Sequence, residues 1–201
     1  AFSDARIKNV LQVSNSAHDL ESLKQITITD YKYIDIIANG DKTVKKVIAQ
    51  ELREVYPQAV SANVTRMIPS IYELSEINDG WINLSTDLVK GDKVRLIFGD
   101  KKEELIVEEV STTRFKVSTD QQGKVFVYGK EVNDFHTVDY EALSTLNISA
   151  TQELVKKIEA LENKNTELTD KVEASVSKEK YTELLKRVES IENIINVEAK
   201  K

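Results

Sequence analysis

The sequence predicts an α+β protein of three parts: a mixed α/β region, a small inserted antiparallel β-module and helices at the C-terminal end. Helix-like and strand-like patterns follow one another over residues 1–77. Over residues 78–140 apolar and polar residues alternate, which is typical of strands. Over residues 141–201 apolar residues recur every three or four positions, the spacing of a coiled-coil seam. These patterns set the expected domain boundaries.

The first region is expected to begin with two helices. A short, solvated helical segment runs to Val10, with Ser3 or Asp4 capping its first amides. The pair Asn15-Ser16 then predicts the N-terminal cap of a second helix over residues 17–24.

A hairpin and a third helix complete the first region. Alternating and β-branched residues over 26–37 predict a strand, and Asn39-Gly40 predicts a tight turn before a second strand over 43–49. A short helix over 50–56 is expected to end at Pro57, because proline lacks the amide hydrogen that a helix needs.

The middle region contains several short strands separated by turns. The predicted strands cover residues 93–98, 104–110, 114–117 and 124–128. Turn residues flank or separate most of these runs: Gly91-Asp92, Gly99-Asp100 and Gln121-Gln122-Gly123. This spacing predicts a small antiparallel barrel or a protruding β-module. Such a module either projects from the chain to hold a neighbouring subunit or a folding client, or is an insertion without a function of its own.

Two apolar stripes predict the C-terminal helices. The first steps by four and three residues: Leu154, Ile158, Leu161, Asn165, Leu168 and Val172. The second consists of Tyr181, Leu184, Val188, Ile191 and Ile195. The two stripes are out of register, and Ser175-Val176-Ser177 offers a turn and a helix cap between them. We therefore favour two helices folded back as a hairpin over one long rod, with packing inside one chain as the alternative to oligomer formation.

The composition excludes several classes of site and partner. The chain has no cysteine, so it forms neither a disulfide nor a thiolate metal site. Its two histidines, His18 and His136, lack ligand-like spacing, so no metal and no cofactor are expected. The net charge of -6 argues against a general nucleic-acid surface. No apolar run reaches membrane-spanning length and no signal peptide opens the sequence, so we expect no membrane partner.

Ser3 and Lys8 form the candidate catalytic pair. A hydroxyl nucleophile and a lysine that could take its proton lie five residues apart at the start of the chain. Residues five apart point in different directions on an ideal helix, so Ser3 must lie outside the helix for the side chains to meet. The bond just upstream, Phe2–Ser3, is open to intramolecular attack, in which tethering replaces substrate binding. The plainer interpretation is that Ser3 is a helix cap.

The same segment carries a resemblance to a known family. The motifs are Ser3-Asp4-Ala5-Arg6-Ile7-Lys8, Tyr31 with Tyr33, Val47-Ile48-Ala49-Gln50-Glu51-Leu52, Tyr56-Pro57-Gln58-Ala59-Val60, and later residues 128–135, 138–140, 146–147 and 150–154. They resemble the intramolecular chaperone autoprocessing domain of phage tail spikes, tail fibres, endosialidases, neck appendages and myelin regulatory factor. At Lys46 the family usually has glycine, so the backbone there is expected to be an ordinary strand.

The resemblance implies a function and a mechanism. Residues 1–77 would be a self-cleaving chaperone core, 78–140 a β-rich insertion and 141–201 the helices of a trimeric coiled coil or bundle. The client of this homotrimer would be a fibrous segment upstream in the same polypeptide, folded in the host-cell cytoplasm during virion assembly. Release would follow from single-turnover autoproteolysis at Phe2–Ser3, with Ser3 as the nucleophile and Lys8 as the general base.

This chemistry requires Lys8 to lose its proton. Because a solvated lysine is almost fully protonated at neutral pH, we expect burial to deprotonate Lys8 when subunits associate, with help from the positive charge of Arg6. The main alternative is a trimerisation or adhesion module without enzymatic activity. A membrane-tethered transcription factor released by the same cleavage has little support, because the chain has neither a membrane span nor a basic DNA-binding element.

Overall fold

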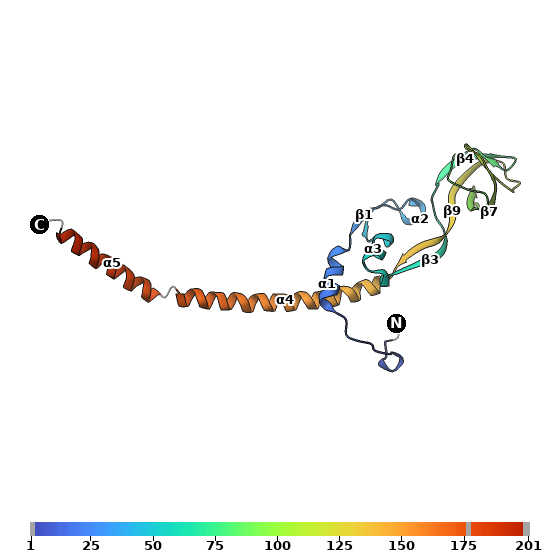
Figure 1. The fold of residues 1–201 in the computed structure, drawn as a ribbon. Coiled ribbons are helices and arrows are strands. Elements are labelled where there is room, and N and C mark those ends of the chain that lie inside the picture. The colour runs from blue at the N-terminus through green and yellow to red at the C-terminus, as the bar shows by residue number, and fades with distance from the viewer. Residues whose placement is uncertain (1–2, 176–177, 199–201) are drawn as a thin grey trace. The chain divides into compact units, whose positions relative to one another are not determined.

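The computed structural model describes residues 3–175 and 178–198 (Figure 1). The contacts divide the chain into two compact units. One contains residues 1–20 together with 148–201, and the other contains residues 21–147. The boundaries fall inside helix α1 (Ser16–Gln25) and helix α4 (Tyr140–Ser175).

The first unit begins with a single turn of 3₁₀ helix. This turn, η1 (Ala5–Ile7), is capped by Asp4, whose carboxylate accepts the backbone N–H of Arg6. The prediction of a helix running to Val10 is wrong, because the backbone becomes extended at Lys8, with φ -120° and ψ 135°. The Asp4 side chain satisfies one backbone N–H of this tight turn, but it does not extend the helix beyond the turn.

The helices of the first unit follow the predicted pattern more closely. The cap of α1 is confirmed, because Asn15 Oδ1 accepts the backbone N–H groups of Ala17 and His18 at 3.2 Å each. The two apolar stripes lie on α4 and on α5 (Lys178–Glu198). The turn predicted between them falls mainly on residues 176 and 177, which lie outside the described residues.

The apolar residues of both stripes are exposed in the single chain. They are Leu154, Ile158, Leu161, Leu168, Val172, Tyr181, Leu184, Val188, Ile191 and Ile195. A hairpin that packed α4 against α5 would bury these side chains, so the favoured hairpin is not seen among the described residues. A threefold coiled coil stays a prediction. None of the helices in the described residues is both long enough and apolar enough to cross a membrane.

The second unit begins with short elements. They are β1 (Thr29–Tyr31), α2 (Ile36–Asn39), β2 (Val44–Lys46), α3 (Ala49–Val55) and the 3₁₀ turn η2 (Pro57–Ala59). Strands β1 and β2 pair antiparallel. Helix α3 ends at Val55, one residue before the predicted last residue, Tyr56. Leu52 of this helix packs with Val47 and Ala59 in a small core.

The predicted tight turn at Asn39-Gly40 is wrong, because these residues end α2. Asp35 caps that helix by accepting the N–H of Ala38, and Gly40, at φ 76°, donates its N–H to the carbonyl of Ile36. The Asp35 carboxylate satisfies a helix amide, and this local bond outweighs the strand-like alternation of the sequence. The two strands are therefore joined by a longer connection that contains a helical turn.

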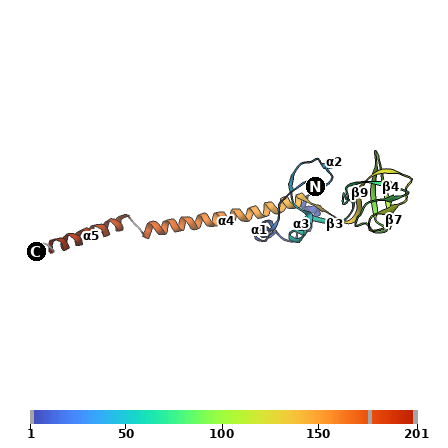
Figure 2. The ribbon, with the colours of Figure 1, turned by 90° about the horizontal axis from the view of Figure 1, so that it is seen from above.

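Strands within residues 73–138 form a closed six-stranded barrel, whose first strand begins before the expected middle region (Figure 2). Its strands are β4 (Glu73–Asn78), β5 (Trp81–Ile82), β6 (Lys93–Phe98), β7 (Lys101–Val110), β8 (Phe115–Val117) and β9 (Gly123–Val138). Neighbouring strands pair antiparallel in the order β9-β4-β5-β8-β7-β6, and β6 pairs back to β9. The predicted barrel is confirmed. Closing the ring pairs the two strands that would otherwise be its edges.

Alternate residues of these strands fill the barrel. The buried residues are Ile77, Ile82, Val94, Leu96, Val107, Phe115, Val117, Val125 and Val127 from the strands and Leu88 from the connection between β5 and β6, none more than 3% exposed. Val94 and Leu96 are two residues apart on β6, so both point inward, as the period of two predicts.

Strand β9 is longer than the sequence predicts. Its first part pairs with β4 and β6 in the barrel, and its second part pairs with β3 (Val60–Met67). The predicted end at Tyr128 is wrong because Gly129 continues the strand at φ 152°. A Cβ at Gly129 would lie 2.1 Å from the carbonyl oxygen of Ile68, so glycine allows two chain segments to approach closely here.

Candidate functional site

The turn η1 brings Ser3 and Lys8 together. Ser3 precedes the turn and Lys8 follows it, and Lys8 Nζ lies 2.7 Å from Ser3 Oγ. Ser3 therefore lies outside the helical turn, which is the condition that the five-residue spacing imposes. A hydroxyl and an amine in direct hydrogen bond are the arrangement that a nucleophile and its general base require.

The charge of Arg6 is compensated within the same turn. Arg6 Nη2 lies 2.6 Å from Asp4 Oδ2, and Arg6 Nε contacts both oxygens of that carboxylate at 3.0 and 3.1 Å. This pair lowers the pKa of Asp4 and raises that of Arg6. Arg6 is therefore already paired with a carboxylate, and its expected help in deprotonating Lys8 stays a prediction.

The Ser3–Lys8 pair sits on a segment with few contacts, residues 3–13, here called the arm. Within the described residues, the hydrogen bonds of the arm all join residues 3–8 to one another. Its apolar side chains are largely exposed, from Ile7 at 69% to Val13 at 93%. Ser3 and Lys8 are exposed as well. Phe2, on the other side of the expected scissile bond, lies outside the described residues.

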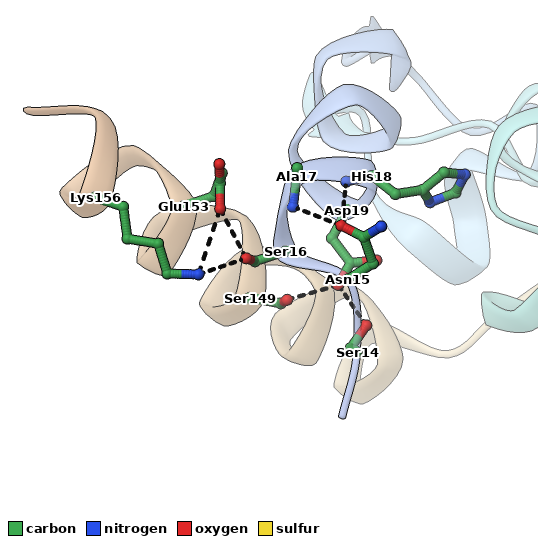
Figure 3. Close-up of polar contacts among 9 residues, drawn as sticks. All are labelled: Ser14, Asn15, Ser16, Ala17, His18, Asp19, Ser149, Glu153 and Lys156. Atoms are coloured by element: carbon green, nitrogen blue, oxygen red, sulfur yellow. Dashed lines mark hydrogen bonds and ion pairs between the residues drawn. The ribbon is translucent and has the colours of Figure 1, made fainter. Parts of the chain in front are cut away.

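A polar cluster joins the chain just after the arm to helix α4 (Figure 3). Asp19 Oδ2 accepts the hydroxyls of Ser14 and Ser149, each at 2.6 Å. One turn further along α4, Glu153 Oε2 accepts the hydroxyl of Ser16 at 2.8 Å. The partners on α4 lie more than a hundred residues away in sequence, so sequence reasoning missed this cluster and no local pattern could have revealed it.

This cluster contains a second serine–lysine pair. Lys156 Nζ lies 2.9 Å from Ser16 Oγ, almost the same separation as in the Ser3–Lys8 pair. However, Lys156 also forms an ion pair with Glu153 at 3.5 Å, which requires the charged lysine, and Ser16 already donates to the same carboxylate. A protonated lysine is not a general base. The carboxylate therefore makes Ser16 and Lys156 a structural contact.

The histidines make no candidate metal site. His136 Nε2 lies 3.1 Å from Arg53 Nη1, and its Nδ1 is buried without a hydrogen-bond partner in the described residues. Among the described residues there is also no group of three or more acidic, histidine or cysteine side chains that could hold a metal ion.

The remaining sequence motifs lie in the second unit. Ala49, Gln50 and Glu51 form the first turn of α3. Lys46 is the last residue of β2 and has no positive φ, so the expected ordinary strand at this position is confirmed. Its Nζ lies 5.7 Å from the centre of the Tyr140 ring.

Comparison with known proteins identifies the N-terminal part of the chain. Residues 3–61 match the model of a peptidase family described as the chaperone of endosialidase. The match starts at Ser3, includes Lys8 and ends before the barrel and the C-terminal helices, so it confirms the resemblance for this segment. No curated protein matches the sequence. The match supports a chaperone domain, related to a peptidase, at residues 3–61.

Proposed function

We propose that this chain is an intramolecular chaperone that assembles as a homotrimer, templates a fibrous segment upstream of it and then releases itself by cutting the Phe2–Ser3 bond. The observation that carries the proposal is the 2.7 Å separation of Lys8 Nζ and Ser3 Oγ at the first residue of the family match. The client would be a phage fibre or spike segment, folded in the host-cell cytoplasm during virion assembly.

The proposed chemistry uses these two side chains and water. Ser3 Oγ attacks the carbonyl carbon of Phe2, while Lys8 takes the hydroxyl proton and gives it to the departing amide nitrogen of Ser3. The peptide bond breaks, and an ester joins the Phe2 acyl group to Ser3 Oγ. Water then hydrolyses the ester, leaving a carboxylate on Phe2 and a free amine and hydroxyl on Ser3. Tethering supplies the proximity that a separate substrate would have to gain by binding.

The proposal requires a neutral Lys8, and the single chain leaves this side chain exposed. A distance of 2.7 Å fits a hydrogen bond in either direction: a charged lysine can donate to the hydroxyl, or the hydroxyl can donate to a neutral lysine. Association of subunits would remove water from the pair and favour the neutral lysine. The exposed apolar residues of the arm, α4 and α5 supply the surface for such association.

Trimerisation would also explain the chaperone activity. Pairing three long β-structured chains in register is a slow, non-local process that is prone to errors. A domain that trimerises first holds the three client chains at high effective concentration and sets their register. Cleavage then removes the template, so that the product is held by a kinetic barrier to unfolding.

The test is a fusion of the native upstream sequence to this chain, followed by mass spectrometry of the fragments. The wild type should yield a fragment that begins at Ser3. Ser3→Ala should remain intact because it lacks the nucleophile, and Lys8→Arg should remain intact because arginine keeps its proton at any accessible pH. Lys42→Arg, an exposed lysine away from the arm in sequence, is the matched control and should be cut normally.

The passive trimerisation or adhesion module gives the opposite result in the same experiment. It predicts an intact fusion for the wild type and for all three variants. Cleavage of Ser3→Ala at the same bond would equally reject the assigned nucleophile.

A further inference from the structure

The direction in which the arm presents Ser3 and Lys8 depends on how its base is held. The bonds of η1 fix the two side chains relative to each other, but in the described part of the chain they do not tie the arm to anything else. The exposed residues of the arm that follow Lys8 also make no hydrogen bond there. The first anchoring contact after the arm is that of Ser14 with Asp19.

The contacts of Asp19 and Glu153 that join the start of α1 to α4 are here called the anchor. Asp19 forms its first half. It lies in the first turn of α1, and one of its oxygens accepts two hydroxyls at 2.6 Å, from Ser14 at the base of the arm and from Ser149 on α4. Its partly buried carboxylate has a lowered pKa, caused first by Ser14 and then by Ser149. The charged carboxylate therefore prefers the bonded arrangement, as expected for strong hydroxyl donors.

Glu153 forms the second half of the anchor. Its side chain is only 15% exposed and accepts Ser16 Oγ at 2.8 Å and Lys156 Nζ at 3.5 Å. The bond from Ser16 is the largest cause of its lowered pKa, and Lys156 and Lys157 act in the same direction. Figure 3 shows both halves of the anchor joining the start of α1 to α4.

Helix α4 uses different faces for this anchor and for its apolar stripe. Ser149 and Glu153 are one turn apart, so they share a face, and Ala150 beside them is fully buried. At 100° per residue, the stripe that begins at Leu154 and Ile158 lies about 140° away, roughly two fifths of a turn. A partner that covers the stripe therefore leaves the anchor intact and holds the helix on which the arm is mounted.

We propose that Asp19 and Glu153 are positioning residues for self-cleavage: they clasp the base of the arm to α4 and so fix the direction in which Ser3 and Lys8 are presented. This inference rests on the proposed function. In this proposal, the anchor formed by Asp19 and Glu153 couples assembly through α4 to the cleavage reaction of Ser3 and Lys8.

The test removes the two hydroxyls that face the carboxylates, in the fusion with the native upstream sequence. Ser16→Ala together with Ser149→Ala should slow cleavage at least tenfold, with unchanged oligomer mass and melting temperature. Ser149→Thr keeps a hydroxyl at that position and should retain most of the rate. The matched control is Ser144→Ala, because among the described residues that hydroxyl bonds only to the carbonyl of Tyr140 within α4. Hydrogen exchange over residues 9–19 should rise in the double variant and not in the control.

The outcomes distinguish a failure of the positioning role of the anchor from a failure of the proposed self-cleavage. If the wild-type fusion is not cut, the proposed self-cleavage fails. If the wild type is cut and the double variant is cut within twofold of its rate, the positioning role is overturned. Unchanged hydrogen exchange in the double variant would show that the anchor does not hold the base of the arm, whether or not the fusion is cut.

Discussion

The barrel and the chaperone segment differ in how far one chain completes their cores. In the barrel, ten buried residues pack together inside a closed ring of strands. In residues 3–61, the buried apolar residues of the described chain are Leu20, Val47, Leu52 and Ala59. The same segment exposes Ile7, Val10, Leu11, Val13, Ile28, Tyr33, Ile34, Ile36 and Ile37. A closed sheet buries its own interior, whereas short helices and a two-stranded ribbon leave apolar surface for other partners.

The C-terminal helices belong with the chaperone segment in this comparison. Their apolar stripes are exposed on both α4 and α5. The barrel should therefore be stable in one chain, while the chaperone segment and the helices should depend on further copies of the chain. Four experiments test this difference, and they follow in order of decreasing effect.

The largest effect is expected from charges in the α4 stripe. Leu161→Glu together with Leu168→Glu should abolish both oligomer formation and cleavage, because each carboxylate would be forced into an apolar seam. Light scattering and the cleavage assay report the two losses, and the barrel should melt as before. The control, Asn163→Glu with Thr166→Glu, adds the same charges at outer positions and should assemble normally. A monomer that still cuts itself at the wild-type rate would show that assembly serves only the client.

The next effect concerns the barrel core. Leu96→Ala should lower the free energy of unfolding of the barrel by about 2–5 kcal/mol, because Leu96 is fully buried and the substitution leaves a cavity. Leu74→Ala is the matched control, since Leu74 is 65% exposed on β4, and it should cost about 0.5 kcal/mol or less. Both are measured by chemical denaturation. Equal losses in the two variants would contradict a core completed within one chain.

A smaller effect is expected where the barrel meets the loop before α2. Asp35 accepts the hydroxyls of Tyr72 and Tyr128 at 3.2 and 3.0 Å as well as the N–H of Ala38. The N–H of Ala38 is the largest cause of the lowered pKa of Asp35, and the two tyrosines add to it. A lowered pKa means that this stability is present above the ordinary carboxyl range and is lost as the pH falls through the lowered value.

Asp35→Asn should therefore lower the free energy of unfolding at pH 7 by about 1 kcal/mol, the scale of a partly exposed hydrogen bond. The difference from the wild type should shrink as the pH falls below about 4. Denaturation curves across this range provide the measurement, with Asp41→Asn, an exposed carboxylate on the other side of α2, as a control. A difference that stays constant down to the lowest pH would show that the charge of Asp35 is not involved.

The smallest effect is expected in the arm. Leu11 is 88% exposed, so Leu11→Ala should change the stability of the monomeric Leu161→Glu and Leu168→Glu variant by about 0.5 kcal/mol or less. In the assembled protein the same substitution should slow cleavage if a second copy covers the arm. A large loss of stability in the monomer would mean that the arm already packs within one chain.

Local sequence patterns were enough where the cause of structure is local. Asn15 caps α1, Pro57 follows the end of α3, and the alternation over residues 93–98 gives strand β6 with the predicted limits. The spacing of Ser3 and Lys8 also predicted that they could meet, since one turn between them suffices. Their catalytic roles stay a prediction.

Tertiary structure decided what depends on residues far apart in the chain. The predicted strand ended just before Gly129, but Gly129 extends β9, and the chain near Ile68 passes too close to it for a side chain. Asn39-Gly40 resembles a hairpin turn, but Asp35 caps a helix there and also bonds Tyr72 and Tyr128. The contacts of Asp19 with α4 and of Glu153 with α1 have no sequence signature, because partners 130 or more residues apart leave no periodic pattern. The sequence by itself thus determined α1, α3, β6, the barrel and the candidate pair, since capping, turn chemistry and periodicity act over a few residues. The three-dimensional fold alone decided which surfaces are closed, which stay exposed and what holds the arm, since these depend on distances between remote segments.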